Sequence, residues 1–152
     1  MQGVGAFTRY WSPVLMVMAL IYVGSTDVLS NQHTSRLLTP VLRWLYPGIS
    51  QARLEQVHAL VRKTGHVTEY ALLAVLIWRG LRQPDKGDTA PFHWREAAWA
   101  LSLAVAYAAT DEVHQAFVRS RYGSVVDVAI DAAGAGAGLF LLWLVGCWRK
   151  RW

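Results

Sequence analysis

Two stretches of this chain contain no charged residue over nearly the whole length that a membrane-spanning helix requires. One lies between Arg9 and Asp27, and the other lies between Asp131 and Arg149. A spanning helix needs roughly 20 mostly apolar residues, because each adds about 1.5 Å across a hydrocarbon core of about 30 Å. The sequence therefore predicts spanning helices at about residues 10–29 and 125–148.

Two further segments, at about residues 57–81 and 95–117, are long enough to span but are cleanly apolar only over Ala71–Trp78 and Ala97–Ala109. The whole chain is 54% hydrophobic and 16% charged, whereas about a quarter of residues are charged in typical soluble domains. This composition favours a bilayer as the solvent. We therefore expect an all-α membrane protein, a four-transmembrane-helix bundle that forms one domain over residues 1–152.

The segment Thr34–Tyr46, between the first two spanning helices, has the pattern of an amphipathic helix lying in the membrane interface. Arg36 and Arg43 occupy a different face from the apolar residues, and we expect both arginines to be solvated or to contact lipid phosphate. Pro47-Gly48 ends this helix, and Ser50 is a candidate N-cap for the next one. The apolar face consists of Leu37, Leu38, Val41, Leu42 and Leu45.

The net charge of +5 does not indicate a nucleic-acid-binding protein, because the basic residues lie at the ends of apolar runs. Cys147 is the single cysteine, so no intrachain disulfide can form. Four crossings place both termini on one side of the membrane. The basic tail after Trp148 favours the cytoplasmic side for both.

The ionisable residues are predicted to meet at one end of the bundle, because consecutive helices run antiparallel. Glu69, Asp111 and Asp131 each lie roughly 10–12 Å below the same boundary, estimated from the rise per residue. A charge at the bilayer centre costs at least about 2.5–3.5 kcal/mol, so such residues normally face a cavity or a partner. We therefore expect a polar pocket that opens to one leaflet.

Helical spacing also gathers the polar residues of each helix on one face. In the second helix these are Arg62, His66, Glu69 and Tyr70; in the third, Tyr107, Asp111, His114 and Gln115; in the fourth, Asp127 and Asp131 with Gly134 and Gly138. The spacing Gly134-x-x-x-Gly138 allows a neighbouring helix to approach closely.

The order of these motifs resembles the VanZ-like family. The resemblance rests on Arg62-Lys63-x-x-His66-x-x-Glu69-Tyr70, then Asp111-Glu112-x-His114-Gln115-x-Phe117-x-x-x-Arg121, then Asp127-x-x-x-Asp131-x-x-Gly134-x-x-x-Gly138. Family members commonly carry two serines at the end of the first helix, where this chain has Gly24-Ser25-Thr26-Asp27. Any hydroxyl role would fall to Ser25 and Thr26.

The resemblance implies a bacterial inner-membrane protein, in a family whose founding member is linked to low-level teicoplanin resistance. It implies no particular reaction. From it and from the helix faces, we expect the catalytic or ligand-binding residues to be Lys63, His66, Glu69, Tyr70, Asp111, Glu112, His114, Gln115, Arg119, Arg121, Asp127 and Asp131.

Several functions fit this cluster. The first is recognition of a lipid or lipid-linked cell-envelope ligand near the outer leaflet, with an effect on glycopeptide susceptibility. The second is an acid–base enzyme that modifies a lipid headgroup or lipid-linked precursor, with Arg119 and Arg121 holding a phosphate. Two further hypotheses stay open: a small proton-coupled transporter, and a structural membrane partner in which ion pairs fasten the helices to one another. A metal site is conceivable, but the spacing matches no zinc motif and nearby Arg and Lys oppose a cation, so we expect no metal and no cofactor.

Overall fold

In the computed structural model, which describes residues 2–26, 31–84, 90–117, 124–150 and 152, all regular structure is α-helical. The described part of the chain forms five helices, which are α1 (Gln2–Ser25), α2 (Asn31–Leu45), α3 (Gln51–Arg82), α4 (Trp94–Ala116) and α5 (Val125–Trp148). The predicted all-α class is therefore confirmed.

The helix ends are set by capping as well as by composition. α5 has the predicted bounds and α4 differs from the prediction by one residue at each end, whereas α3 begins six residues earlier than expected. Ser50 caps α3, since its hydroxyl accepts a hydrogen bond from the backbone N–H of Arg53 at 3.3 Å. Ser124 caps α5 in the same way through Val126 N–H at 3.2 Å. The first helix is shifted toward the N-terminus and ends at Ser25 rather than near residue 29.

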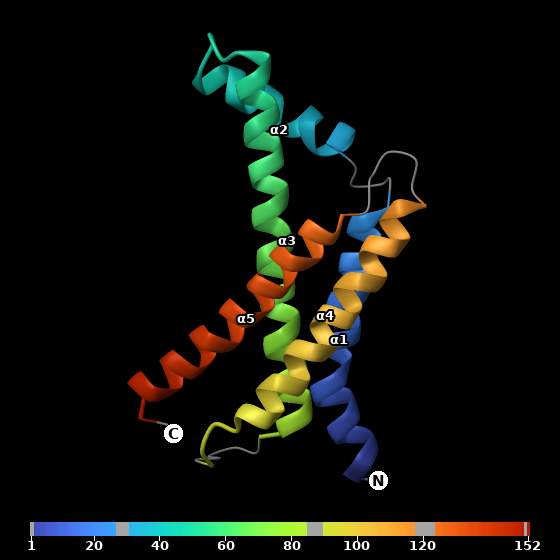
Figure 1. The fold of residues 1–152 in the computed structure, drawn as a ribbon, viewed down its shortest axis with the longest axis vertical. Coiled ribbons are helices and arrows are strands. Elements are labelled where there is room, and N and C mark those ends of the chain that lie inside the picture. Colours follow the sequence, from blue (N-terminus) through green and yellow to red (C-terminus); the bar gives the residue numbers. More distant parts are fainter. Residues whose placement is uncertain (1, 27–30, 85–89, 118–123, 151) are drawn as a thin grey trace.

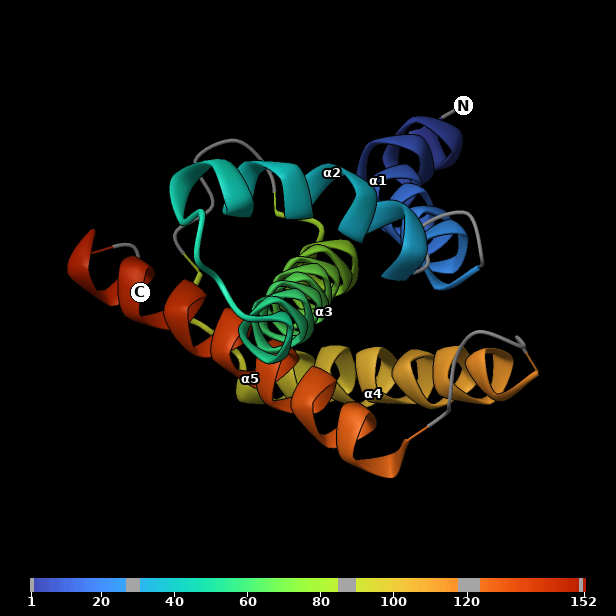
Figure 2. The ribbon, with the colours of Figure 1, turned by 90° about the horizontal axis from the view of Figure 1, so that it is seen from above.

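α3 is the central helix of the molecule. It contacts α1, α2, α4 and α5, and α5 crosses it at a wide angle (Figure 1). Its 32 residues give a length of about 48 Å, so its N-terminal turns extend beyond the other long helices. Within the described residues, α2 contacts no helix other than α3, and it runs across the extended end of α3 (Figure 2).

The core lies around the C-terminal half of α3. There Tyr70, Leu73 and Ala74 have no exposed surface. α4 presents a narrow strip of small residues to this core, and α1 presents one apolar face. The strip on α4 is Ala97, Ala100, Ala104 and Ala108, and the face on α1 is Tyr10, Val14, Val17 and Ile21.

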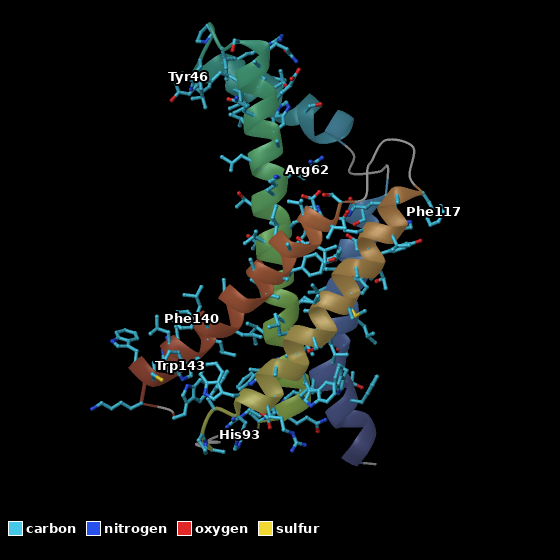
Figure 3. All side chains as sticks on the ribbon, in the orientation of Figure 1. Tyr46, Arg62, His93, Phe117, Phe140 and Trp143 are labelled. Carbon is cyan, nitrogen blue, oxygen red and sulfur yellow. The ribbon has the colours of Figure 1, made fainter. Side chains whose placement is uncertain are left out.

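The two ends of the bundle differ in chemistry. At the end where α4 begins, Phe92 stacks on Trp78 with ring centroids 5.3 Å apart and meets Trp94 edge-on at 5.1 Å. His93 and Trp143 lie at this same end in Figure 3. The opposite end, where α1 and α4 finish and α5 begins, holds buried polar side chains.

Two helices are long and apolar enough to cross a membrane among the residues described. They are α1, over Phe7–Ser25, and α5, over Val125–Trp148. α3 and α4 are long enough to cross a membrane but not apolar enough, because they carry more polar and charged residues. The four-span bundle therefore stays a prediction.

Candidate functional site

The polar end of the bundle is built from four helices. The last turn of α1, the middle of α3, the last two turns of α4 and the first two turns of α5 come together there (Figure 1). Five polar side chains in this region are at most 6% exposed: Ser25, Asp111, Glu112, Gln115 and Asp131. The helix order and spacing thus bring polar residues from distant parts of the sequence to one location.

Asp111 connects α4 to α1. Its Oδ2 atom accepts a hydrogen bond from the Ser25 hydroxyl at 2.7 Å and another from the Gln115 side-chain amide at 2.8 Å. The same amide lies 3.3 Å from the Ser25 oxygen, which closes a three-residue network. Because both hydrogen bonds end on one carboxylate oxygen, this network holds Asp111 in one orientation.

His66 and Asp131 connect α3 to α5. His66 Nδ1 lies 3.7 Å from Asp131 Oδ1, and the Asp131 side chain is 1% exposed. The pair lies close to the point where the glycines of α5 pack on α3. A Cβ atom at Gly134 would stand 2.6 Å from the carbonyl oxygen of Val67, and one at Gly138 would stand 2.6 Å from that of Ala71. The two helix backbones therefore touch where only glycine fits.

Three more of the expected residues lie around this network. The carboxylate of Glu112 accepts a hydrogen bond from the Ser124 backbone N–H at 2.7 Å, which ties the end of α4 to the start of α5. The His114 ring stacks on Tyr22 of α1, with centroids 4.6 Å apart. Tyr70 is completely buried.

Tyr107 completes the side of the cluster next to Tyr70. The two rings are 6.4 Å apart. The Tyr107 hydroxyl donates a hydrogen bond to the backbone carbonyl of Met18 at 2.7 Å, so this side chain holds α4 against α1.

Several buried polar atoms in the cluster have no hydrogen-bond partner. Eight such side-chain atoms occur among the described residues, and six of them are in this cluster: His66 Nδ1, Tyr70 Oη, Asp111 Oδ1, His114 Nδ1 and both carboxylate oxygens of Asp131. Most buried polar atoms in folded proteins have a partner, because leaving one unpaired costs about 1–3 kcal/mol. The cluster therefore holds buried polar atoms without hydrogen bonds among the described residues, although His66 Nδ1 and Asp131 Oδ1 lie 3.7 Å apart as an ion pair.

Three of the remaining expected residues lie at the edge of the cluster, where they are more exposed than its buried members. Lys63 and Glu69 are exposed on α3, and Asp127 is half-buried in the first turn of α5. Arg119 and Arg121 lie outside the described residues, as does the side chain of Arg36. A phosphate-binding role for Arg119 and Arg121 therefore stays a prediction from the sequence.

The metal alternative finds no further support in the geometry. His66, Glu69, Asp111, His114 and Asp131 include acceptable ligands, but no three His, Cys, Asp or Glu side chains are grouped to hold an ion in the part of the chain that the structure describes.

Ser25 is the member of the network that the list of expected site residues omitted. The sequence held a signal for it, since Ser25 and Thr26 end the first helix where relatives commonly have two serines. Ser124 carried no comparable signal, because its backbone contact with Glu112 depends on how the helices pack.

The fold and the cluster together define an all-helical protein of membrane type, with two strongly apolar helices and a buried polar site between helices. The VanZ/LLP1 family model matches residues 10–146, which is most of the chain. The chain therefore belongs to the VanZ/LLP1 family, and the resemblance found in its motifs is confirmed. No curated protein and no solved structure matches it.

Proposed function

We propose that this chain is a four-span protein of the bacterial inner membrane, forming one domain over residues 1–152, with both termini in the cytoplasm. The support is the distribution of polar and apolar side chains, which is the reverse of that in a water-soluble protein. Polar residues such as Asp111 and Asp131 are buried, whereas Leu20, Trp99 and Phe140 are each more than half exposed. Exposed large apolar residues suit a lipid surface and are unfavourable in water.

The limited hydropathy of α3 is compatible with spanning. α1, α4 and α5 all contact α3, so its membrane-embedded half meets protein on several sides rather than lipid alone. A polar residue in a spanning helix is tolerated where it faces other helices. On this proposal, the N-terminal turns of α3 and all of α2 lie at or beyond the outer boundary of the bilayer.

The polar cluster, we propose, recognises a lipid or a lipid-linked cell-envelope ligand, and through it affects susceptibility to teicoplanin. The observation that carries this proposal is the set of six buried polar atoms without a hydrogen bond, on His66, Tyr70, Asp111, His114 and Asp131. A ligand with hydroxyl or amide groups could supply their missing hydrogen bonds. The teicoplanin connection rests on the family's founding member.

The test is teicoplanin susceptibility of a sensitive Gram-positive host that expresses the wild type or Asp111→Asn at equal membrane levels. Asparagine can still accept the hydrogen bonds from Ser25 and Gln115 through its carbonyl oxygen, so the fold should persist while the carboxylate is lost. Glu96→Gln is the matched control, because it makes the same change at the other end of α4.

The proposal expects protection by the wild type and by Glu96→Gln, and loss of protection with Asp111→Asn. Equal protection by all three would show that the carboxylate is dispensable and would favour a purely structural cluster. If even the wild type does not protect, the resistance phenotype of the family does not extend to this chain in that host.

One contact favours the acid–base enzyme as a second candidate. The Ser25 hydroxyl donates to Asp111 at 2.7 Å, so the carboxylate is placed to accept the Ser25 proton while the oxygen attacks the carbonyl carbon of a lipid ester. The ester C–O bond then breaks, the alcohol leaves with the proton held by Asp111, and water hydrolyses the acyl-serine to release the fatty acid and restore Ser25. Lipid extracts from cells expressing the wild type, Ser25→Ala or Asp111→Asn would be compared by mass spectrometry. A lipid changed only by the wild type would favour the enzyme, and unchanged lipids with altered susceptibility would favour binding.

A further inference from the structure

A second polar site lies away from the cluster, between α2 and the N-terminal turns of α3. It is a groove with a cavity volume of about 490 Å³, which we call the α2–α3 groove. Its lining includes Ser35, Thr39 and Arg43 from α2, together with Glu55, His58 and Arg62 from α3. The volume falls within the range of about 300–1,000 Å³ that is typical of ligand pockets.

The groove lies beside the line along which α2 packs on α3. Ser35, Thr39 and Arg43 are spaced by four residues and so share one face of α2. Ser35 and Thr39 are half-buried, and so are Leu38 and Leu42 on the apolar side. α2 therefore meets α3 along the border between its polar and apolar faces, and its polar side chains line the groove.

The walls of the groove are organised by contacts on both helices. Thr39 Oγ1 lies 3.3 Å from His58 Nε2, which bridges α2 and α3 across the groove. The carboxylate of Glu55 accepts a hydrogen bond from the Gln51 side-chain amide at 3.3 Å, so it is engaged along its own helix. Arg62 is exposed on α3, and it lies beside that helix, below α2, in Figure 3.

The charge of the groove suits an anion. Two arginines against one glutamate leave a formal charge of +1 when His58 is neutral. Guanidinium groups bind phosphate through paired hydrogen bonds. We infer that the α2–α3 groove binds a phosphate group, carried either by a lipid headgroup or by a soluble phosphate compound.

Position along α3 makes this site accessible. Arg62 precedes His66 by four residues, or about 6 Å, and the rest of the groove lies farther toward the N-terminus of α3. A phosphate in the groove therefore does not have to enter the buried cluster. The inference goes beyond the proposed function and does not depend on it.

The test measures binding by the full chain in dodecyl maltoside, a detergent without phosphate. Inorganic phosphate and dihexanoyl phosphatidylglycerol are titrated separately by isothermal calorimetry. We expect saturable binding of at least one probe, weakened about tenfold by Arg43→Gln and by Arg62→Gln, because each removes a charged donor pair. Glu55→Gln should strengthen binding about threefold, because it removes the one carboxylate of the groove.

Arg53→Gln is the matched control, because Arg53 is exposed near the start of α3 but lines a different cavity. It should leave the affinity within about twofold of wild type. Binding of inorganic phosphate alone would assign a soluble ligand, and binding of the lipid alone would assign a headgroup. Binding of neither probe, or an equal loss with Arg53→Gln and Arg43→Gln, would overturn the inference.

Discussion

The contact between α5 and α3 makes a sharp prediction for Gly134→Ala. The added methyl carbon would stand 2.6 Å from the Val67 carbonyl oxygen and 2.8 Å from Val67 Cα, whereas ordinary contacts begin at 3.4 Å. Because both obstacles are backbone atoms of a helix, a side chain cannot move aside to make room. The helices must separate by up to about 0.8 Å, and such overpacking costs about 1–3 kcal/mol.

Gly136→Ala is the matched control on the same helix. No heavy atom lies within 4 Å of the position that its Cβ would occupy. Alanine is favoured over glycine inside a helix by about 0.5–1 kcal/mol, so this variant should be slightly more stable than the wild type. The two substitutions are chemically identical and lie two residues apart, yet they should shift stability in opposite directions.

Thermal unfolding followed by circular dichroism in one detergent would test both variants. Gly134→Ala gains the same helix preference of about 0.5–1 kcal/mol, so its net loss is up to about 2.5 kcal/mol. A change of 1 kcal/mol corresponds to about 2–4 °C in Tm for a chain of this size, so Gly134→Ala should lower Tm by up to about 10 °C. The reasoning fails if Gly134→Ala unfolds at or above the wild-type temperature, or if both variants shift Tm the same way and by the same amount.

Two further predictions concern α4 and use the same measurement. Ala104 has no exposed surface, so Ala104→Leu should lower the free energy of unfolding by about 1–3 kcal/mol. The control is Ala109→Leu, which should cost little because Ala109 is exposed. Equal losses at both positions would argue against the packing face assigned to α4. Tyr107→Phe removes a hydrogen bond of 2.7 Å to a backbone carbonyl of α1 and should lower the free energy of unfolding by about 1 kcal/mol. Tyr46→Phe is the control, because the Tyr46 ring is exposed. An unchanged Tm for Tyr107→Phe would mean that this bond adds no stability.

The helices could be predicted from the sequence to the extent that apolar composition marks them. α5 lies between clear boundaries and was predicted at both ends. The predicted span of α3 began at about residue 57 because Arg53 and Glu55 interrupt the apolar pattern, whereas the prediction of Ser50 as the N-cap gave the true beginning and is confirmed. A charge ends a hydrophobic segment but does not end a helix, which continues where its backbone is capped and its side chains are exposed.

The location of the polar residues followed from antiparallel helix order, but their orientation did not. His66 and Glu69 were assigned to one face of α3, yet His66 approaches Asp131 while Glu69 is exposed. The rotation of α3 about its axis is fixed by the contacts of Val67 and Ala71 with the α5 glycines. Such a rotation depends on how two helices pack together, so it cannot be predicted from the residue pattern of one helix.

The enclosure of α3 also has a consequence for biogenesis in the proposed membrane arrangement. α3 is synthesised before α4 and α5, the helices that later cover two of its sides. Until α5 leaves the ribosome, His66 has no Asp131 beside it, and the backbone at Val67 and Ala71 has no glycine surface against it. A nascent chain brings these groups together only after α5 has emerged, so the site is completed late in the order in which the helices are made.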